Sequence, residues 1–330
     1  MVGGLARRVQ WLKENRKKKD ASLLLDAGDS LFPGEYARGD IYKKRADYML
    51  EVYGMLGYDA FGIGRRDLPF GIQFLEEQSK KHGIEFVSAN LLSKGKRPFA
   101  PYKVFKVGDT KVAVISVISS RPNKTWEAMS ISVVDPRPFL QETVPALRKE
   151  ADLVVLLSNL GEVEDRNLVK EIPGIDLVIG SGLGSRFKFP VKVADKTYMV
   201  RPQSRGKSIG WVEINIPFTG QDDEIKGELV FLSGVVKDDP EVAKKVKALE
   251  TETRKWERIH KKKVSSSPKD RKKAAKDNPF LKALEKARKQ RKALDAKGEK
   301  GSGASFLEIL KKGQTEQPAA PSNQDSLRLK

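Results

Sequence analysis

Apolar residues in the first 235 positions fall in two patterns, helical spacing and short continuous runs. Helical spacing predicts helices over 3–18, 40–56, 69–81, 136–150 and 166–171. Continuous runs predict buried strands over 22–26, 60–63, 85–88, 153–157 and 177–179. The Gly108-Asp109 pair, between the apolar runs 102–107 and 111–118, predicts a β-hairpin. Alternation of strands and helices favours an α/β fold.

The pattern changes in the last third of the chain. Strands over 191–193, 198–201, 210–216 and 228–232 read as antiparallel. Helices are expected over 241–263 and 279–294, and the Pro- and Gln-containing end reads as disordered. We therefore predict a domain over 1–236, a basic helical extension over 237–313 and a disordered tail over 314–330.

Charge is concentrated in that extension. The chain carries a net charge of +19, and residues 237–330 hold 27 Lys and Arg against 14 Asp and Glu. Such a segment favours contact with a polyanion or an acidic protein, although an anionic membrane surface and a solvated helix pair without a partner stay open. The absence of cysteine excludes disulfides, thiolate metal sites and cysteine nucleophiles. No apolar run reaches about 18 residues, so no transmembrane segment is expected.

Several segments, in a fixed order, carry a resemblance to a known family. They are Gly3-Gly4-Leu5-Ala6, Leu23-Leu24-Leu25-Asp26-Ala27-Gly28-Asp29, Gly57-Tyr58-Asp59-Ala60, Ser88-Ala89-Asn90-Leu91 and Pro173-Gly174-Ile175-Asp176. Together they resemble the N-terminal domain of bacterial 5'-nucleotidases in the calcineurin-like metallophosphoesterase superfamily. The resemblance implies a four-layer αββα sandwich with mixed sheets, followed here by the basic helical C-terminal extension.

The resemblance also implies where a two-metal phosphoesterase site would lie. The family's ligands are an opening Asp-x-His, a Gly-Asp, a Gly-Asn-His, a later His and a Gly-His-x-His. Here the Gly-Asp is Gly28-Asp29, and Arg65-Arg66, followed by Asp67, stands in place of the Asn-His pair. Asn159 stands in place of the later His, and Gly182 and Gly184, after Ser181, stand in place of the closing pair. Only Asp29 is retained as a strong metal ligand. The two histidines, His82 and His260, do not align with these positions.

The opening strand with its Asp-x-His would precede Met1. Its absence leaves an unfilled position in a sheet, and we expect the natural start to lie upstream. Members of the family are usually exported to the periplasm, yet no signal peptide is visible at Met1. The compartment is therefore left open.

Electrostatics argues against a two-metal site with these residues. Two +2 ions about 4 Å apart repel by roughly 16 kcal/mol at an effective dielectric near 20. One carboxylate does not offset that repulsion, and arginines add to it. We expect a pseudoenzyme with a hydrolase fold, no catalytic residue and no cofactor, which acts as a phosphate- or nucleotide-binding or protein-binding module.

In that hypothesis Arg65 or Arg66 pairs with Asp29 and leaves an anion pocket, because a guanidinium suits phosphate oxygens. The alternative from the residues alone is that both arginines face solvent. A second function stays open: an active phosphoesterase that hydrolyses nucleotides or other phosphomonoesters with two divalent metals (Mn, Zn or Mg) at an atypical site.

Overall fold

The structure is a computed structural model that describes residues 3–16, 22–121, 123–203 and 206–264. The chain divides into two compact units, Met1–Trp256 and Glu257–Lys330, and the first unit holds the fold and the site. The expected helix over 279–294 and the expected disordered tail over 314–330 lie outside the described residues, as does most of the segment to which a polyanion or acidic partner was assigned.

The first sheet is small, parallel and covered by helices. Its order is β1-β2-β3, formed by β1 (Leu25–Asp26), β2 (Ala60–Gly62) and β3 (Phe86–Val87). The helices of this layer are α1 (Leu5–Asn15), α2 (Asp40–Leu56) and α3 (Gly71–His82). An apolar cluster that includes Leu50, Phe61 and Leu75 joins α2 and α3 to the sheet. The helical spacing seen in the sequence therefore marks the faces that pack on the sheet.

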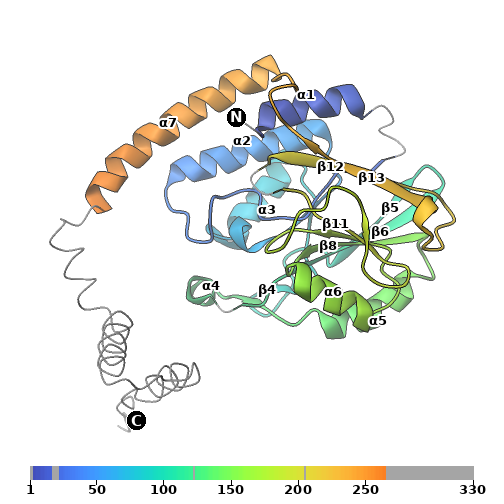
Figure 1. Cartoon of the computed structure of the whole chain (residues 1–330). Coiled ribbons are helices and arrows are strands. Elements are labelled where there is room, and N and C mark those ends of the chain that lie inside the picture. The colour runs from blue at the N-terminus through green and yellow to red at the C-terminus, as the bar shows by residue number, and fades with distance from the viewer. Residues whose placement is uncertain (1–2, 17–21, 122, 204–205, 265–330) are drawn as a thin grey trace, which may run out of the picture. The chain divides into compact units, whose positions relative to one another are not determined.

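The second sheet has six strands in the order β10-β11-β9-β8-β6-β5. They are β5 (Tyr102–Val107), β6 (Thr110–Ile118), β8 (Leu153–Asn159), β9 (Leu177–Gly180), β10 (Val191–Lys192) and β11 (Tyr198–Val200). The helices α5 (Arg137–Leu147) and α6 (Glu162–Glu171) cover its outer face through an apolar cluster that includes Leu140, Leu156 and Leu168. A third cluster, with Ala60, Val114 and Leu157, fills the space between the two sheets. Helices, sheet, sheet and helices thus form the four expected layers (Figure 1).

Further elements complete the first unit, and the long helix among them, α7 (Pro240–Val264), continues past Trp256. Two antiparallel pairs are formed by β12 (Ser208–Ile214) with β13 (Ile225–Phe231), and by β4 (Leu91–Ser93) with β7 (Ile131–Val133). The remaining elements are α4 (Lys124–Ala128) and the 3₁₀ turns η2 (Arg65–Asp67) and η3 (Asp222–Glu224). The sequence pattern does not indicate β4, β7 or α4.

One expectation about strand direction is wrong. The pattern over 198–201 predicts an antiparallel strand, but β11 pairs in parallel with β9, with Tyr198 opposite Leu177. Its other neighbour, β10, is antiparallel. Tyr198 and Met199 are both buried, as in an internal strand, and a run of three residues is too short for its periodicity to indicate direction.

The beginning of the first unit is tied to its end. The amide of Gly3 donates to the carbonyl of Leu232 (2.7 Å), and the ammonium of Lys13 contacts the carboxylate of Asp239 (2.6 Å). The start of α7 packs through Val242 on an apolar cluster with α1 and α2, and farther along α7 the Trp256 ring contacts Tyr42 edge-on at 5.7 Å. The boundary predicted after residue 236 stays a prediction. Among the described helices, none is long and apolar enough to span a bilayer.

Candidate functional site

The residues singled out in the sequence gather at the carboxyl ends of four strands. Asp29 follows β1, η2 follows β2, Asn159 ends β8, and Ser181 follows β9. The side-chain oxygen of Asn159 accepts the Arg65 amide (3.2 Å), and its amide group donates to the Ser181 hydroxyl (2.8 Å). Parallel α/β sheets place their sites at this edge. The structure thus brings residues from both sheets into one site.

Asp67 fixes the two turns from which the site is built. Its carboxylate accepts backbone N–H groups of Gly64 (2.8 Å), Asp29 (2.7 Å), Ser30 (3.0 Å) and Leu31 (2.9 Å). The side chain is fully buried, and burial raises the pKa of Asp67 to about 8, with a further contribution from the charge of Asp29. Its oxygens are occupied by the backbone, so Asp67 positions Asp29 and does not face the cleft.

Arg66 lies against Asp29, as one form of the anion-pocket hypothesis requires. Asp29 has a φ of 64°, and its carboxylate accepts the Arg66 amide at 2.8 Å. The Arg66 Nε lies 3.4 Å from the other carboxylate oxygen, and the side chain is about one third exposed. Among the described residues, the Nη atoms of Arg66 have no hydrogen-bond partner. One face of this guanidinium is therefore available to a ligand.

Arg65 has a different environment. It is buried, and its guanidinium makes a two-pronged contact with Glu35 (2.9 and 2.7 Å) and donates to the Arg121 carbonyl (2.6 Å). Its charge also lies 4.3 Å from the centre of the Trp126 ring. The hydrogen bond from Arg65 lowers the pKa of Glu35. Arg65 thus holds a loop in place and does not pair with Asp29.

Arg201, which the sequence analysis missed, occupies the space beside the closing glycines. Its guanidinium donates to the carbonyls of Ser181 (2.7 Å) and Leu183 (2.8 Å). A Cβ at Gly180 would lie 2.3 Å from its Nη1, and one at Gly184 would lie 2.9 Å from its Nε. The predicted site glycine Gly184 therefore leaves room for an arginine, while Gly182 provides a turn with φ 70°.

Asp165 pairs with Arg201 in the interior. Its carboxylate accepts a hydrogen bond from Arg201 at 2.9 Å and another from the Ser158 hydroxyl. Burial raises the pKa of Asp165 to about 6 and lowers the pKa of Arg201, with their mutual attraction acting against both shifts. Desolvation therefore exceeds attraction in this pair, as is common for buried ion pairs. No sequence motif links these residues, which lie 36 positions apart.

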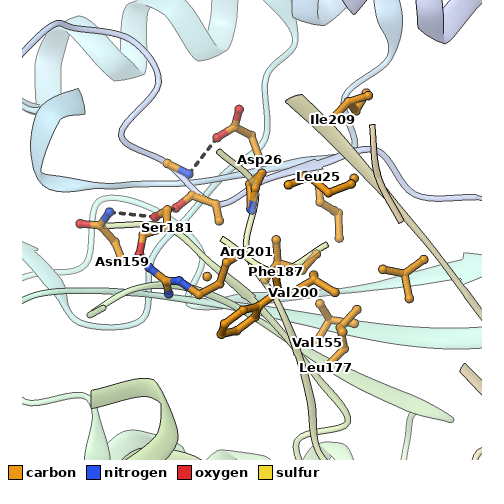
Figure 2. A pocket seen from close by; sticks show the side chains of 18 of the residues that line it. Leu25, Asp26, Val155, Asn159, Leu177, Ser181, Phe187, Val200, Arg201 and Ile209 are labelled. Carbon is orange, nitrogen blue, oxygen red and sulfur yellow. Dashed lines mark hydrogen bonds between the residues drawn. The ribbon is translucent and has the colours of Figure 1, made fainter. Parts of the chain in front are cut away.

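The site opens into a large cleft of about 2080 Å³. Figure 2 shows Asn159, Ser181 and Arg201 on one side of it, and apolar side chains such as Val155 and Leu177 on another. Asp26 lies at the boundary and accepts hydrogen bonds from the Ser30 hydroxyl (2.9 Å) and the Tyr53 hydroxyl (2.9 Å). One end of this cleft is therefore lined by hydrogen-bonding side chains and the rest mainly by apolar side chains.

The described residues of this site offer few ligands for divalent cations. Among the described residues, no group of three or more His, Cys, Asp and Glu side chains is placed to hold a metal ion. Both oxygens of Asp29 contact Arg66, and both polar atoms of the Asn159 amide are hydrogen-bonded. A guanidinium adjoins the only retained acidic ligand of the aligned motif.

Among proteins of known sequence, this chain is similar to 5'-nucleotidases and to a nucleotide phosphoesterase. No family model matches the chain. The chain is 25% identical over 280 residues to snake venom 5'-nucleotidase of Gloydius brevicauda, covering 74% of this chain and 45% of that protein. Human 5'-nucleotidase is 25% identical over 271 residues, which are 73% of this chain and 46% of that protein. The trifunctional nucleotide phosphoesterase protein YfkN of Bacillus subtilis is 24% identical over 256 residues, which are 64% of this chain and 18% of that protein. The chain spans about half the length of the 5'-nucleotidases it matches.

Solved structures share the fold. A Thermus thermophilus 5'-nucleotidase precursor is 25% identical with a TM-score of 0.62, covering 76% of this chain and 54% of that one. The T. thermophilus sulfate thiohydrolase SoxB gives a TM-score of 0.63 at 23% identity (77% and 48%). The calcineurin-like phosphoesterase YfkN of B. subtilis gives 0.58 at 21% (78% and 91%). The mixed-sheet metallophosphoesterase fold expected from the sequence is confirmed.

Proposed function

We propose that this chain, whose homologues are 5'-nucleotidases and calcineurin-like phosphoesterases, binds a phosphate-bearing ligand such as a nucleotide without two-metal hydrolysis. The observation that carries the proposal is the contact of Arg66 with Asp29 at the carboxyl ends of the strands. It places a guanidinium beside the one retained acidic residue. Because that guanidinium has free Nη atoms, it attracts an anion rather than a metal ion.

The surroundings of Arg66 support an anion as the ligand. The Ser181 hydroxyl donates to the Ala27 carbonyl (2.7 Å), which fixes the loop after β9 beside the turn after β1. Asn159 and Ser181 therefore form a rigid polar wall of the same cleft that Arg66 lines. A guanidinium presents a planar fork of N–H donors that matches two phosphate oxygens. The arrangement supports recognition of a phosphate group.

Isothermal titration calorimetry with AMP and with inorganic phosphate tests this proposal. Wild-type protein is expected to bind at low salt, and Arg66→Ala is expected to weaken binding at least about tenfold, since a hydrogen bond to a charged group contributes roughly 1.5–3 kcal/mol. A matched control is Arg254→Ala on α7, which removes another exposed arginine, one that faces Glu250 at 3.7 Å. Arg65 is unsuitable because it holds the loop.

The outcome decides whether Arg66 binds a ligand or has only a structural role. Equal affinity in wild type and Arg66→Ala, or no binding heat with either probe, contradicts the proposal. Equal weakening in Arg66→Ala and Arg254→Ala indicates nonspecific attraction to a basic protein and contradicts it as well.

The second candidate is an active phosphoesterase. The homologues are 5'-nucleotidases and a nucleotide phosphoesterase, which favours this candidate, and so does the position of Asp29 at the end of β1. It requires ligands other than those that the described residues supply. Elemental analysis for Mn, Zn and Mg, together with AMP hydrolysis assayed with added Mn²⁺, separates the two candidates. Stoichiometric metal and Mn²⁺-dependent hydrolysis that is lost in Asp29→Ala would establish the enzyme.

A further inference from the structure

We propose that Arg121 is a specificity-determining residue of the phosphate site, and that it makes the site select a phosphate group with two negative charges. A phosphomonoester carries such a group above a pH of about 6, whereas a phosphodiester carries one negative charge. The inference rests on the proposed function, because it concerns a second contact to the phosphate that Arg66 binds. It is carried by the position of the Arg121 loop and by the pairing of charges along the cleft.

The loop that carries Arg121 leaves the six-stranded sheet at the edge where the site lies. It follows β6, which runs parallel to β8, and the last residue of β6, Ile118, is opposite Asn159 at the end of β8. The exposed Arg121 side chain lines the same cleft as Arg66. The fold therefore places the two arginines on different loops at one end of the strands.

The backbone at Arg121 is fixed beside η2. Its carbonyl accepts a hydrogen bond from the Arg65 guanidinium (2.6 Å), which also donates to the carbonyl of Ser119 (3.2 Å). Arg65 directly precedes Arg66 in η2, so the Arg121 loop and the proposed phosphate contact share one buried anchor. A side chain on a fixed backbone loses less conformational freedom when it binds a ligand.

The carboxylates that line the cleft are already paired with basic side chains. Every one of them among the described residues has a basic partner at 3.8 Å or less. The pairs are Asp26 with Arg8, Asp29 with Arg66, Glu35 with Arg65, Asp135 and Glu164 with Arg137, Glu213 with Lys226, and Glu228 with Lys188.

Two basic side chains of the cleft have no such partner. Among the described residues that line it, Arg121 and Arg186 alone are basic and have no carboxylate at ion-pair distance. Arg186 lies beside β13, where its guanidinium is 6.0 Å from the centre of the Phe231 ring. Arg121 is therefore the unpaired cation at the sheet edge that holds the phosphate site.

Glu35 lies near Arg121 but is bound to other residues. Its two carboxylate oxygens contact the Arg65 guanidinium at 2.9 and 2.7 Å, and one of them accepts the side-chain amide of Asn123 (3.1 Å). The hydrogen bond from Arg65 lowers the pKa of Glu35, and the charge of Arg121 adds a smaller contribution. The Arg121 guanidinium is therefore close to this carboxylate without being bonded to it, and its N–H donors are available to a ligand.

The two arginines contribute differently to an anion site. Arg66 lies 3.4 Å from Asp29, so that pair has no net charge and binds a phosphate mainly through hydrogen bonds. Arg121 adds a positive charge that no carboxylate offsets. Coulomb energy is proportional to the product of the charges, so a dianion gains twice as much from this charge as a monoanion does. The preference for a doubly charged phosphate is therefore assigned to Arg121.

Calorimetry with two nucleotides that differ by one charge tests the inference on the full-length protein. At a pH of about 8 the phosphate of AMP is a dianion and that of cyclic AMP is a monoanion. We expect the wild type to bind AMP at least about tenfold more tightly than cyclic AMP. Arg121→Ala should weaken AMP binding at least about tenfold and cyclic AMP binding less than about threefold. Arg121→Lys keeps the charge and should retain part of the preference.

A matched control separates Arg121 from general attraction by a basic cleft. Arg186→Ala removes the other unpaired arginine and should leave both the affinity for AMP and the preference unchanged. Arg121→Ala should not shift the midpoint of urea unfolding, because the side chain is exposed and its substitution leaves the backbone contacts of the loop in place. Weaker binding in Arg121→Ala then reports on the ligand contact and not on the fold.

The outcomes distinguish this inference from the proposed function. If Arg66→Ala weakens AMP binding while Arg121→Ala retains the wild-type preference for AMP over cyclic AMP, the site binds phosphate as proposed and the inference is overturned. Equal affinity of the wild type for the two nucleotides, or equal weakening by Arg121→Ala and Arg186→Ala, overturns it too. Absence of binding heat with both AMP and inorganic phosphate overturns the proposed function, and the inference with it.

Discussion

Replacement of Arg201 by methionine tests the strongest electrostatic claim about the site. The guanidinium is 3% exposed and the Asp165 carboxylate 0% exposed at the side chain, with 2.9 Å between them. Arg201→Met keeps most of the side-chain volume and leaves the aspartate without a counter-charge. It also removes the donors that hold the carbonyls of Ser181 and Leu183.

The expected loss of stability is large for a single substitution. Removing one partner of a buried ion pair costs about 3–5 kcal/mol, because an uncompensated charge stays in the interior. Replacing both partners by apolar residues is often close to neutral. The double variant Asp165→Leu/Arg201→Met should therefore be more stable than the sum of its single variants predicts, by at least about 2 kcal/mol.

Urea unfolding of the four proteins at pH 5 and pH 8 measures this effect. Burial already raises the pKa of Asp165 to about 6 in the wild type, and loss of the guanidinium raises it further. Acid then neutralises the orphaned carboxylate in the folded variant. The loss caused by Arg201→Met should shrink as the pH falls from 8 to about 6, by up to about 1.4 kcal/mol for each unit below the variant's pKa, and then level off because the wild-type carboxyl is protonated as well.

Two results would refute this reasoning. Additivity of the single substitutions within about 0.5 kcal/mol would show that the pair is not coupled. An equal loss at pH 5 and pH 8 would show that the carboxylate charge is not its source, and that the lost carbonyl contacts account for the effect.

Three further predictions concern the framework of the site. Arg65→Met should destabilise the protein by about 2–4 kcal/mol in urea unfolding. Arg65→Lys should restore little of this stability, because lysine lacks the planar fork that contacts Glu35. Equal stability of the lysine variant and the wild type would contradict this. Gly64→Ala should cost about 1–3 kcal/mol in thermal unfolding, since its Cβ would lie 2.5 Å from an Asp29 carboxylate oxygen; an unchanged midpoint would show that the turn relaxes. Burial raises the pKa of Asp176 to about 6, above its usual value of 3.8. The free energy of unfolding of the wild type, relative to that of Asp176→Asn, should therefore fall as the pH rises from about 4 to about 6. A difference that does not change with pH would exclude a raised pKa of Asp176.

The arrangement of helices and strands was largely readable from the sequence where local chemistry determines it. The Gly108-Asp109 turn fixes the β5–β6 register, and Val107 indeed faces Thr110 across it. The short pair β4–β7 escaped prediction because each strand has three residues, too few for a periodic signal. The direction of β11 depends on which strand it joins, which is a property of the tertiary structure. Sequence reasoning therefore succeeded for turns and long periodic segments.

The site was only partly predictable for the same reason. Family motifs located Asp29, Asn159 and Ser181, and the structure brings them together at the sheet ends. The partners that give the arginines their roles were not predicted. Glu35 lies 30 residues before Arg65, and Asp165 lies 36 residues before Arg201. Such pairs have no spacing rule, so a sequence can indicate which residues carry charge but not which charges meet.

The ties between the two ends of the first unit set an order for its synthesis. Lys13 and Asp239 are separated by 226 residues in the chain, yet their side chains lie 2.6 Å apart. At roughly 5–20 residues per second, a ribosome needs about 11–45 s to reach Asp239 after Lys13. During that interval the apolar face of α1 packs on α2 but lacks the contact with Val242 at the start of α7. A nascent chain of this protein is therefore expected to carry an incompletely docked first helix until translation has passed the start of α7.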